Sequence, residues 1–483
     1  MLRRISSSVR LAIGALCALG LAATPVQAVL AESGEHTSTL GDQQAVSVTI
    51  YNDNLALVRD ERRITLPKGT LRVALRDVSA QMDPSTALLH SLTSAGAVSV
   101  IEQNFDFDLL SPEKLLEKYV GRDVTVIHSN PRTGAETREQ AKVLSVNGGV
   151  VLQYANRIET GVDGRLSFPS IPPNLRDRPT LVTDLDNSYD GPQQVELDYL
   201  TGGMSWRADY VGVLNAADNR LDLNGLITLT NTSGATYTDA RMQLVAGNIN
   251  RAQVPQTLRT LGAMNAAPAA EVRQETLFEY HLYTLTRPTT IADQQTKQVA
   301  LLSASGVPVT KSLELRGQEY YYYQQAGDLG QQLKPQVYLE FSNDGGGLGI
   351  PLPKGIVRIY KKDSQGNTQF VGEDTIDHTA RKERVRLLLG ESFDVTATKK
   401  QTDFKRIAPY GDRYEYVSSY TIEMRNAKDT PVTLKVVEPM PGDWSIAAEN
   451  FSHVKTSSTT STWTITVPPS GKTTLSYTVH VIY

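Results

Sequence analysis

Four consecutive tyrosines, Tyr320 to Tyr323, are the feature of this sequence best suited to binding chemistry. Flat aromatic rings stack on sugars and on the apolar surface of a partner. The run also fits an ordinary strand, in which alternate side chains would place two rings in the core and two on the surface. A Gly- and Gln-rich stretch, residues 324–333, follows and is interpreted as a loop. We therefore name Tyr320, Tyr321, Tyr322 and Tyr323 as candidate contacts for a ligand or partner.

Patterns that could support catalysis are incomplete. Ser205, in Gly203-Met-Ser205-Trp-Arg207, lacks the second glycine of a nucleophile elbow. Ser452-His-Val-Lys455 fits Ser-x-x-Lys, which is common by chance and stands here without its partner motifs. Gly471-Lys-Thr473 lacks the glycine that a phosphate loop requires five residues upstream. The sequence predicts no catalytic residue and favours a protein that is not an enzyme.

Residues that could bind a metal ion are scattered along the chain. No two of the seven histidines are four residues apart, as a helical metal site would need. Asp186-Asn-Ser-Tyr-Asp-Gly191 has the oxygen spacing of a calcium loop, but Leu197 occupies the position of the bidentate acid. Because Asp, Asn, Ser and Gly also build ordinary turns, we interpret this segment as a turn. Neither a metal ion nor another cofactor is expected.

The first 28 residues have the pattern of a secretory signal peptide. Three arginines accompany an apolar run at residues 11–23, which is too short to span a bilayer comfortably. Val26-Gln-Ala28 then offers small residues for cleavage. Cleavage there would remove the only cysteine, Cys17, so we expect a periplasmic or secreted chain without disulfides.

The charge of the chain argues against one class of partner. The sequence has 48 Lys and Arg against 52 Asp and Glu, and without the signal peptide the balance is 45 against 52, a net charge of −7. Nucleic-acid binding requires a basic surface, so nucleic acid is not an expected partner. No run of 18 apolar residues follows the signal peptide, so no transmembrane helix is expected.

β-Strands are expected throughout the rest of the chain. Val46, Val48 and Ile50 alternate with Ser and Thr, which is the period of a half-buried strand. Many further short apolar segments are separated by Gly, Pro and Asn. This pattern predicts an all-β protein built of several antiparallel β-sandwich domains of immunoglobulin-like type.

One short helix and a small barrel-like insert interrupt this pattern. Ser111 can cap a helix that begins at Pro112, carries its apolar stripe to Tyr119 and ends before Gly121. Short strands follow, with a tight hairpin turn at Asn147-Gly-Gly149. We interpret residues 110–174, approximately, as the insert.

The expected domain organisation is a signal peptide at 1–28, a flexible lead-in at 29–44, an N-terminal β domain at 45–194 that includes the insert, a central β-sandwich at 195–330 with a loop at 248–274, and a C-terminal β-sandwich at 331–483.

Four spaced stretches carry a family resemblance: Leu197-Asp-Tyr-Leu-Thr-Gly-Gly-Met-Ser-Trp-Arg-Ala-Asp-Tyr210, Glu279-Tyr-His-Leu-Tyr283, Gly349-Ile-Pro-Leu-Pro-Lys-Gly355 with Val357-Arg-Ile-Tyr360, and Gly390-Glu-Ser-Phe-Asp-Val395. They resemble a bacterial family of secreted proteins of unknown function that includes the mucoidy-inhibitor-A-like proteins. The resemblance covers most of residues 46–483 and implies an exported, β-rich protein, without supplying catalytic residues. The long helical, coiled-coil-like insert of the members named for mucoidy does not occur in this sequence.

Together these observations favour an exported, non-catalytic protein of the cell envelope, acting as a binding or scaffold module through its loops and strand edges. Its expected partner is an envelope protein or a glycan. The main alternative is an envelope hydrolase of glycan or peptide, which needs two carboxylates about 5 to 10 Å apart in a concave pocket near aromatic residues. A weaker alternative is an outer-membrane β-barrel, since residues 475–483 alternate as a closing barrel strand would.

Overall fold

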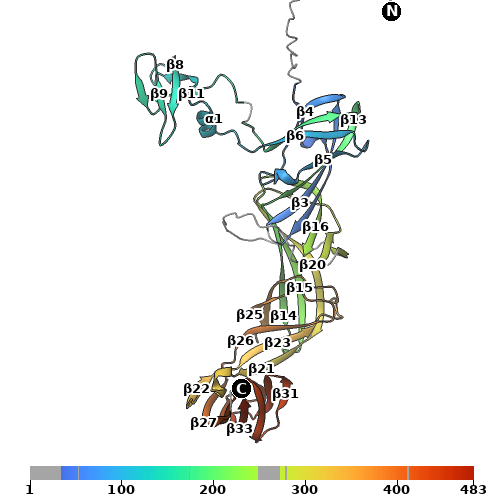
Figure 1. The fold of residues 1–483 in the computed structure, drawn as a ribbon, viewed down its shortest axis with the longest axis vertical. Coiled ribbons are helices and arrows are strands. Elements are labelled where there is room, and N and C mark those ends of the chain that lie inside the picture. Colours follow the sequence, from blue (N-terminus) through green and yellow to red (C-terminus); the bar gives the residue numbers. More distant parts are fainter. Residues whose placement is uncertain (1–33, 53, 173–174, 248–271, 278–279, 411–412) are drawn as a thin grey trace, which may run out of the picture.

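The computed structural model describes residues 34–52, 54–172, 175–247, 272–277, 280–410 and 413–483. The predicted signal peptide and most of the loop expected at 248–274 lie outside these ranges. The described chain is built almost entirely of strands, which confirms the predicted all-β fold class. Its sheets follow one another along an elongated body, from which one small sheet projects sideways (Figure 1). Among the described helices, none has the length and apolar composition needed to cross a bilayer.

Two sheets form the N-terminal end of the body. The first contains, in order, β1 (His36–Ser38), β4 (Gly69–Arg76), β12 (Thr180–Asn187) and β6 (Val98–Asp106). The second contains β17 (Val272–Leu277), β18 (Tyr280–Leu285), β16 (Tyr237–Ala246), β2 (Gln43–Tyr51), β3 (Leu55–Leu66), β13 (Gly191–Thr201) and β5 (Leu88–Ser91), with β19 (Thr289–Ile291) also paired to β16. Strands from residues 45–194 and 195–330 thus share this second sheet.

A five-stranded sheet continues the body. It contains β20 (Gln295–Pro308), β15 (Arg220–Asn231), β14 (Met204–Leu214), β24 (Gly355–Lys362) and β25 (Thr368–Ile376). One apolar cluster includes residues of this sheet and of both preceding ones, for example Val58, Leu185 and Leu229. The alternation predicted for Val46, Val48 and Ile50 is confirmed, because all three are buried in this cluster.

Two further sheets form the C-terminal sandwich. One contains β26 (Arg384–Glu391), β23 (Gln336–Ser342), β21 (Thr310–Arg316), β29 (Val432–Pro439), β32 (Thr460–Val467) and β31 (Val454–Ser457). The other contains β22 (Asp328–Leu333), β27 (Val395–Tyr410), β28 (Arg413–Asn426), β33 (Gly471–Ile482) and β30 (Asp443–Glu449). Their facing sides bury a second core around Trp463. Most neighbouring strands are antiparallel, but β1–β4, β2–β16, β14–β24 and β21–β29 are parallel.

The insert is the small sheet that projects from the body. Its order is β10 (Ile158–Thr160), β9 (Val151–Gln153), β8 (Glu136–Ser145), β7 (Asp123–Ser129) and β11 (Arg165–Ser167), and it has a core of its own. The predicted helix is confirmed as α1 (Pro112–Lys118), with the Ser111 hydroxyl accepting a hydrogen bond from the Lys114 backbone N–H at 3.1 Å. Gly121, where the helix was expected to stop, has a φ of +80°.

The flexible lead-in expected at 29–44 is wrong for its described part. β1 pairs with β4, and the 3₁₀ helix η1 (Leu40–Asp42) follows with a capping box between Thr39 and Asp42. A buried side chain from another sheet helps to hold β1 in place. The Arg62 guanidinium of β3 donates a hydrogen bond to the Ser38 carbonyl at 3.1 Å. Two more 3₁₀ helices are described, η2 (Pro84–Thr86) and η3 (Glu319–Tyr322).

Buried asparagines close the turns that follow four of the long strands. Asn187, Asn231 and Asn426 end β12, β15 and β28, and Asn343 follows β23. Each is at most 2% exposed and donates from its amide to at least two backbone carbonyls of neighbouring loops. Buried carbonyls at strand ends need such partners. The Asp186–Gly191 segment, with its calcium-like spacing, contains one of these turns.

Candidate functional site

The four consecutive tyrosines lie on η3 and the residue after it, so the expected alternation of a strand is wrong. The adjacent Tyr321 and Tyr322 are buried, whereas Tyr320 and Tyr323 are 42% and 45% exposed. A 3₁₀ helix has three residues per turn, so side chains at i and i+3 share one side. The first and fourth rings therefore face solvent together, and the second and third enter the core.

The two buried tyrosines anchor η3 to the C-terminal core. The Tyr322 hydroxyl donates a hydrogen bond to Glu438 Oε2 at 2.7 Å and lies 3.0 Å from the Tyr477 hydroxyl. The ring of Tyr321 lies 4.3 Å from Lys399 Nζ, and its carbonyl accepts a hydrogen bond from the Tyr420 hydroxyl. These contacts leave Tyr320 and Tyr323 as the members of the run that a ligand can reach.

The buried rings make the C-terminal sandwich sensitive to alkali. Burial raises the pKa of Tyr321 and of Tyr420 to about 12, above the ordinary value of 10.0. Their folded pKa is raised, so the stability they contribute is complete below pH 10 and is lost as the pH rises toward 12. We expect tyrosinate absorbance and loss of β-sheet circular dichroism to develop together over this range. Complete tyrosine ionisation below pH 10.5, with the sheet signal intact, would contradict this.

The exposed tyrosines continue into a larger set of aromatic side chains. The Tyr323 ring lies 6.1 Å from that of Tyr483, which lies 5.8 Å from Tyr416, and Tyr416 lies 5.7 Å from Phe404. Tyr323 and Tyr483 are exposed, whereas Tyr416 and Phe404 are half-buried. Together with Tyr320 and Tyr414, which are exposed, these residues define what we call the aromatic surface.

Strand length explains why these rings are uncovered. β27 and β28 have 16 and 14 residues, whereas β21, β23, β29 and β32 of the facing sheet have seven or eight. Tyr416 lies on the same side of β28 as the buried Tyr420 and Ile422, because strand side chains alternate. The core-facing side of the longer sheet therefore extends beyond its partner, and its outer part presents aromatic rings to solvent.

Polar and charged groups accompany these rings. The Arg406 guanidinium lies 5.1 Å from the centre of the Tyr414 ring. The Glu415 carboxylate contacts His480 Nε2, and alternation along β28 and β33 places this pair on the other side of the sheet. Burial and the neighbouring Tyr323 raise the pKa of the Tyr483 hydroxyl, so it stays protonated and able to donate a hydrogen bond. The arrangement offers flat apolar faces with hydrogen-bonding groups beside them.

Part of the aromatic surface was not predicted from the sequence. The stretch 324–333 was expected to be a loop, but β22 occupies Asp328–Leu333 and pairs with β27 at the sheet edge. Phe404 and Tyr416 were not identified, although the spacing of Tyr414 and Tyr416 places both on one side of a strand. Their exposure depends on the length of the facing sheet, which no local pattern encodes.

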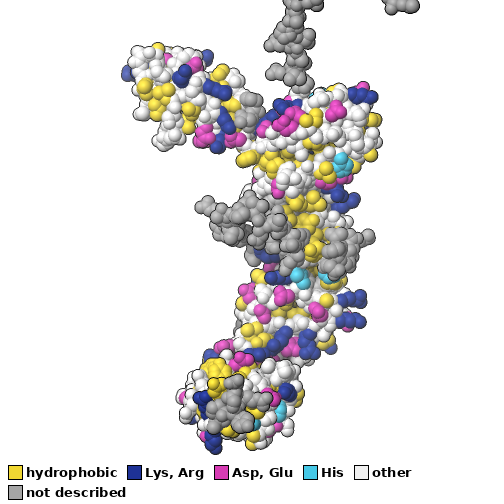
Figure 2. Space-filling view, in the orientation of Figure 1, with side chains coloured by type: hydrophobic (Ala, Val, Ile, Leu, Met, Phe, Trp, Pro, Cys, Tyr) yellow, Lys and Arg dark blue, Asp and Glu magenta, His cyan; other side chains and the backbone are white. Residues whose placement is uncertain are grey.

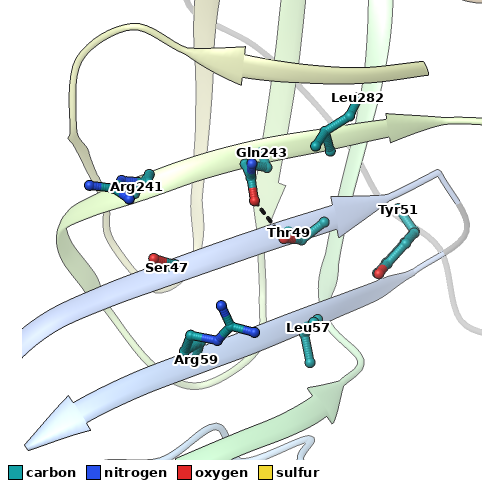
Figure 3. A pocket seen from close by; sticks show the side chains of 8 residues that line it. All are labelled: Ser47, Thr49, Tyr51, Leu57, Arg59, Arg241, Gln243 and Leu282. Atoms are coloured by element: carbon teal, nitrogen blue, oxygen red, sulfur yellow. Dashed lines mark hydrogen bonds between the residues drawn. The ribbon is translucent and has the colours of Figure 1, made fainter. Parts of the chain in front are cut away.

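A cavity lies on the outer side of the eight-stranded sheet, over β2, β3, β16 and β18 (Figure 3). It has a volume of about 370 Å³ and is lined by Ser47, Thr49, Tyr51, Leu57, Arg59, Arg241, Gln243 and Leu282. The Thr49 hydroxyl donates a hydrogen bond to Gln243 Oε1 at 3.3 Å. The charged side chains of this lining are arginines, not the paired carboxylates that glycoside hydrolysis uses.

A cluster of ionisable groups lies beside this cavity. His90 on β5 pairs with Glu196 on β13, and the potential ligand atoms of His90, Glu196 and Asp198 lie within 4.8 Å of one another. Arg59 Nε lies 3.1 Å from Asp198 Oδ1 and 3.5 Å from Glu196 Oε2. Burial and the carboxylates of Asp198 and Glu61 raise the pKa of Glu196. The Arg59 guanidinium thus supplies the positive charge that a metal ion would supply.

Three of the four stretches that carry the family resemblance meet in the middle of the body, and the fourth, Gly390–Val395, lies in the C-terminal sandwich. Tyr210 on β14 and Tyr283 on β18 donate hydrogen bonds to the carbonyls of Pro353 and Pro351, at 2.8 and 3.0 Å. β14 pairs with β24 in parallel, and a Cβ at Gly355 would lie 2.2 Å from the Ala208 carbonyl oxygen. The contacts of these residues hold strands together. A structural role therefore accounts for their presence in the motifs that carry the resemblance.

The model of a domain of unknown function, DUF4139, matches residues 195–483, more than half of the chain. The chain belongs to the DUF4139 family. No curated protein matches it. The DUF4139 match begins inside β13 and includes the whole aromatic surface, as well as Glu196 and Asp198. His90 and Arg59, which complete the ionisable cluster, lie outside it.

Proposed function

We propose that this DUF4139 protein is an exported, non-catalytic protein of the cell envelope that binds a glycan through its aromatic surface. The observation that carries the proposal is the uncovered side of β27 and β28, where aromatic rings face solvent in series. Sugar rings present apolar C–H faces and hydroxyl edges. The rings of Tyr323, Tyr483 and Tyr416 suit the faces, and the Arg406 guanidinium and the tyrosine hydroxyls suit the hydroxyls.

Charge is consistent with a neutral or weakly charged partner. On the face drawn in Figure 2, acidic and basic side chains are interspersed along the body, without an extended patch of one sign. Electrostatic attraction therefore gives no preference for a highly charged polymer. The resemblance to mucoidy-inhibitor-A-like proteins is part of the support for this proposal. It supports only the action of the protein in the envelope.

The double substitution Tyr323→Ala with Tyr483→Ala tests the proposal. Loss of two stacking rings, each contributing about 0.5–1.5 kcal/mol, should weaken binding roughly tenfold. Co-sedimentation of the purified protein with envelope glycan would measure this. Phe370→Ala is the matched control, because Phe370 is 56% exposed on β25, outside the aromatic surface. Equal binding by the double variant and the control would show that the aromatic surface is not the binding site.

The alternative of a hydrolase has less support. Glu196 and Asp198 are linked to the cavity of Figure 3 through Arg59, which lines it and contacts both carboxylates. Burial raises the pKa of Glu196, as a general acid requires, but the Arg59 guanidinium occupies the space between the two carboxylates, and neither carboxylate lines the cavity.

Export predicts a defined N-terminus. If the signal peptide is cleaved after Ala28, the mature protein begins at Val29. We expect N-terminal sequencing of the protein from the periplasmic or secreted fraction to begin at that residue. Deleting residues 11–23 should leave the protein in the cytoplasm. An intact Met1 on the exported protein would contradict cleavage, and a wild-type protein confined to the cytoplasm would contradict export.

A further inference from the structure

The core of the C-terminal sandwich contains a lysine and a glutamate that the proposed function does not use. Lys399 on β27 and Glu438 on β29 come from facing sheets and are 1% and 0% exposed. Lys399 Nζ lies 2.6 Å from Glu438 Oε2. Removing both charges from water is expensive, and their attraction offsets this only when hydrogen bonds satisfy the remaining atoms.

Those remaining atoms are only partly satisfied. Tyr322 donates to Glu438 Oε2, whereas Glu438 Oε1 is buried and has no hydrogen-bond partner among the described residues. Aromatic rings surround the amine, with the centres of Tyr321 and Tyr420 at 4.3 and 5.3 Å from Nζ. Gly317 packs against the carboxyl group so closely that a Cβ there would lie 1.9 Å from Oε2. The pair is thus held in place among buried aromatic rings.

This environment disfavours the charged form of the Lys399 amine. Burial lowers the pKa of Lys399, and proton transfer within the pair gives a neutral amine beside a neutral acid. A neutral amine is a nucleophile, and fixed proximity replaces the entropy that a bimolecular reaction would lose. We propose that Lys399 Nζ condenses with the Glu438 carboxyl group to form an amide bond that joins the two sheets.

The reaction balances without another reactant. The Nζ lone pair attacks Cδ, the N–Cδ bond forms, and the Cδ–Oε1 bond breaks. The proton already transferred to the carboxyl group and one amine proton leave with Oε1 as water, and the other amine proton remains on the amide nitrogen. Oε2 becomes the amide carbonyl and keeps the hydrogen bond from Tyr322.

The product removes what is unfavourable in the starting pair. Both buried charges disappear, and the oxygen that leaves is the one without a hydrogen-bond partner. Release of water from an apolar core into bulk solvent favours condensation over the reverse hydrolysis.

Mass spectrometry of the purified, folded full chain tests the proposal. Trypsin does not cleave after an acylated lysine, so residues 387–400 should remain intact and be joined to residues 436–455. The joined product should be about 18 Da, one water, lighter than the two peptides together. Lys399→Arg should yield the two segments separately in any folding state. Cleavage after Lys399 and an unmodified 436–455 peptide from the folded wild type would overturn the proposal. Loss of glycan binding has no bearing on this readout.

Discussion

Replacing Arg62 by methionine should destabilise the N-terminal part of the body by about 3–5 kcal/mol, the cost of leaving a buried charge without its partner. Arg62 is fully buried on β3, and its Nε and Nη2 donate to Asp60 Oδ2 at 2.9 and 2.8 Å. Its other hydrogen bonds go to the backbone carbonyls of Ser38 and Arg76, at the ends of β1 and β4. One side chain thus joins the two N-terminal sheets.

Methionine fills similar space but satisfies none of these acceptors. Asp60 would keep a hydrogen bond from Gln43, at 2.8 Å, without a compensating charge. The measurement is the urea midpoint of the transition that reports on the N-terminal sheets. Arg63→Met, at the exposed neighbouring position, is the control. Adding Asp60→Asn to the Arg62 variant should recover part of the loss. Equal midpoints for the Arg62 and Arg63 variants would contradict this role.

Replacing Gly317 by alanine should have an effect of similar size on the C-terminal sandwich. The added Cβ would lie 1.9 Å from Glu438 Oε2 and 2.6 Å from Cδ, closer than any non-bonded contact allows. Because the surrounding core is closely packed, the carboxyl group must move away from Lys399 and Tyr322. Overpacking costs about 1–3 kcal/mol, and displacing the buried Glu438 group from its partners adds to it, so we expect a loss of about 3–5 kcal/mol.

Gly327→Ala provides the comparison for this substitution. Gly327 is exposed and a Cβ there meets nothing within 4 Å, so alanine should leave stability nearly unchanged. Thermal unfolding followed by near-ultraviolet circular dichroism would report on the tyrosines and Trp463 of this core. Similar melting temperatures for the two variants would show that the Glu438 carboxyl group is not confined as described.

Local sequence patterns predicted the local elements. Ser111, Pro112 and Gly121 marked both ends of α1, because capping and left-handed backbone are properties of single residues. Alternation predicted the buried side of β2 for the same reason. The all-β class followed from many such segments.

Long-range pairing could not be predicted in this way. β2 pairs in parallel with β16, a strand about two hundred residues later, and this pairing joins segments that were expected to form separate domains. The sequence of the tyrosine run is compatible with a strand as well as with a 3₁₀ turn. Hydrogen bonds from Tyr322 to Glu438 and from Tyr420 to the Tyr321 carbonyl fix it as a 3₁₀ turn. Which rings face solvent was therefore decided by residues far away in sequence.

The most direct test of the central claim is photo-crosslinking in the envelope of living cells. A photoreactive phenylalanine analogue would replace Tyr320, which is exposed within the aromatic surface, or Phe370, which is exposed outside it. We expect a crosslinked adduct from position 320 that glycan-degrading enzymes shorten, and little adduct from position 370. An adduct from position 320 that only a protease removes would show a protein partner in place of a glycan. Equal adducts from both positions, or none from position 320, would contradict binding through the aromatic surface.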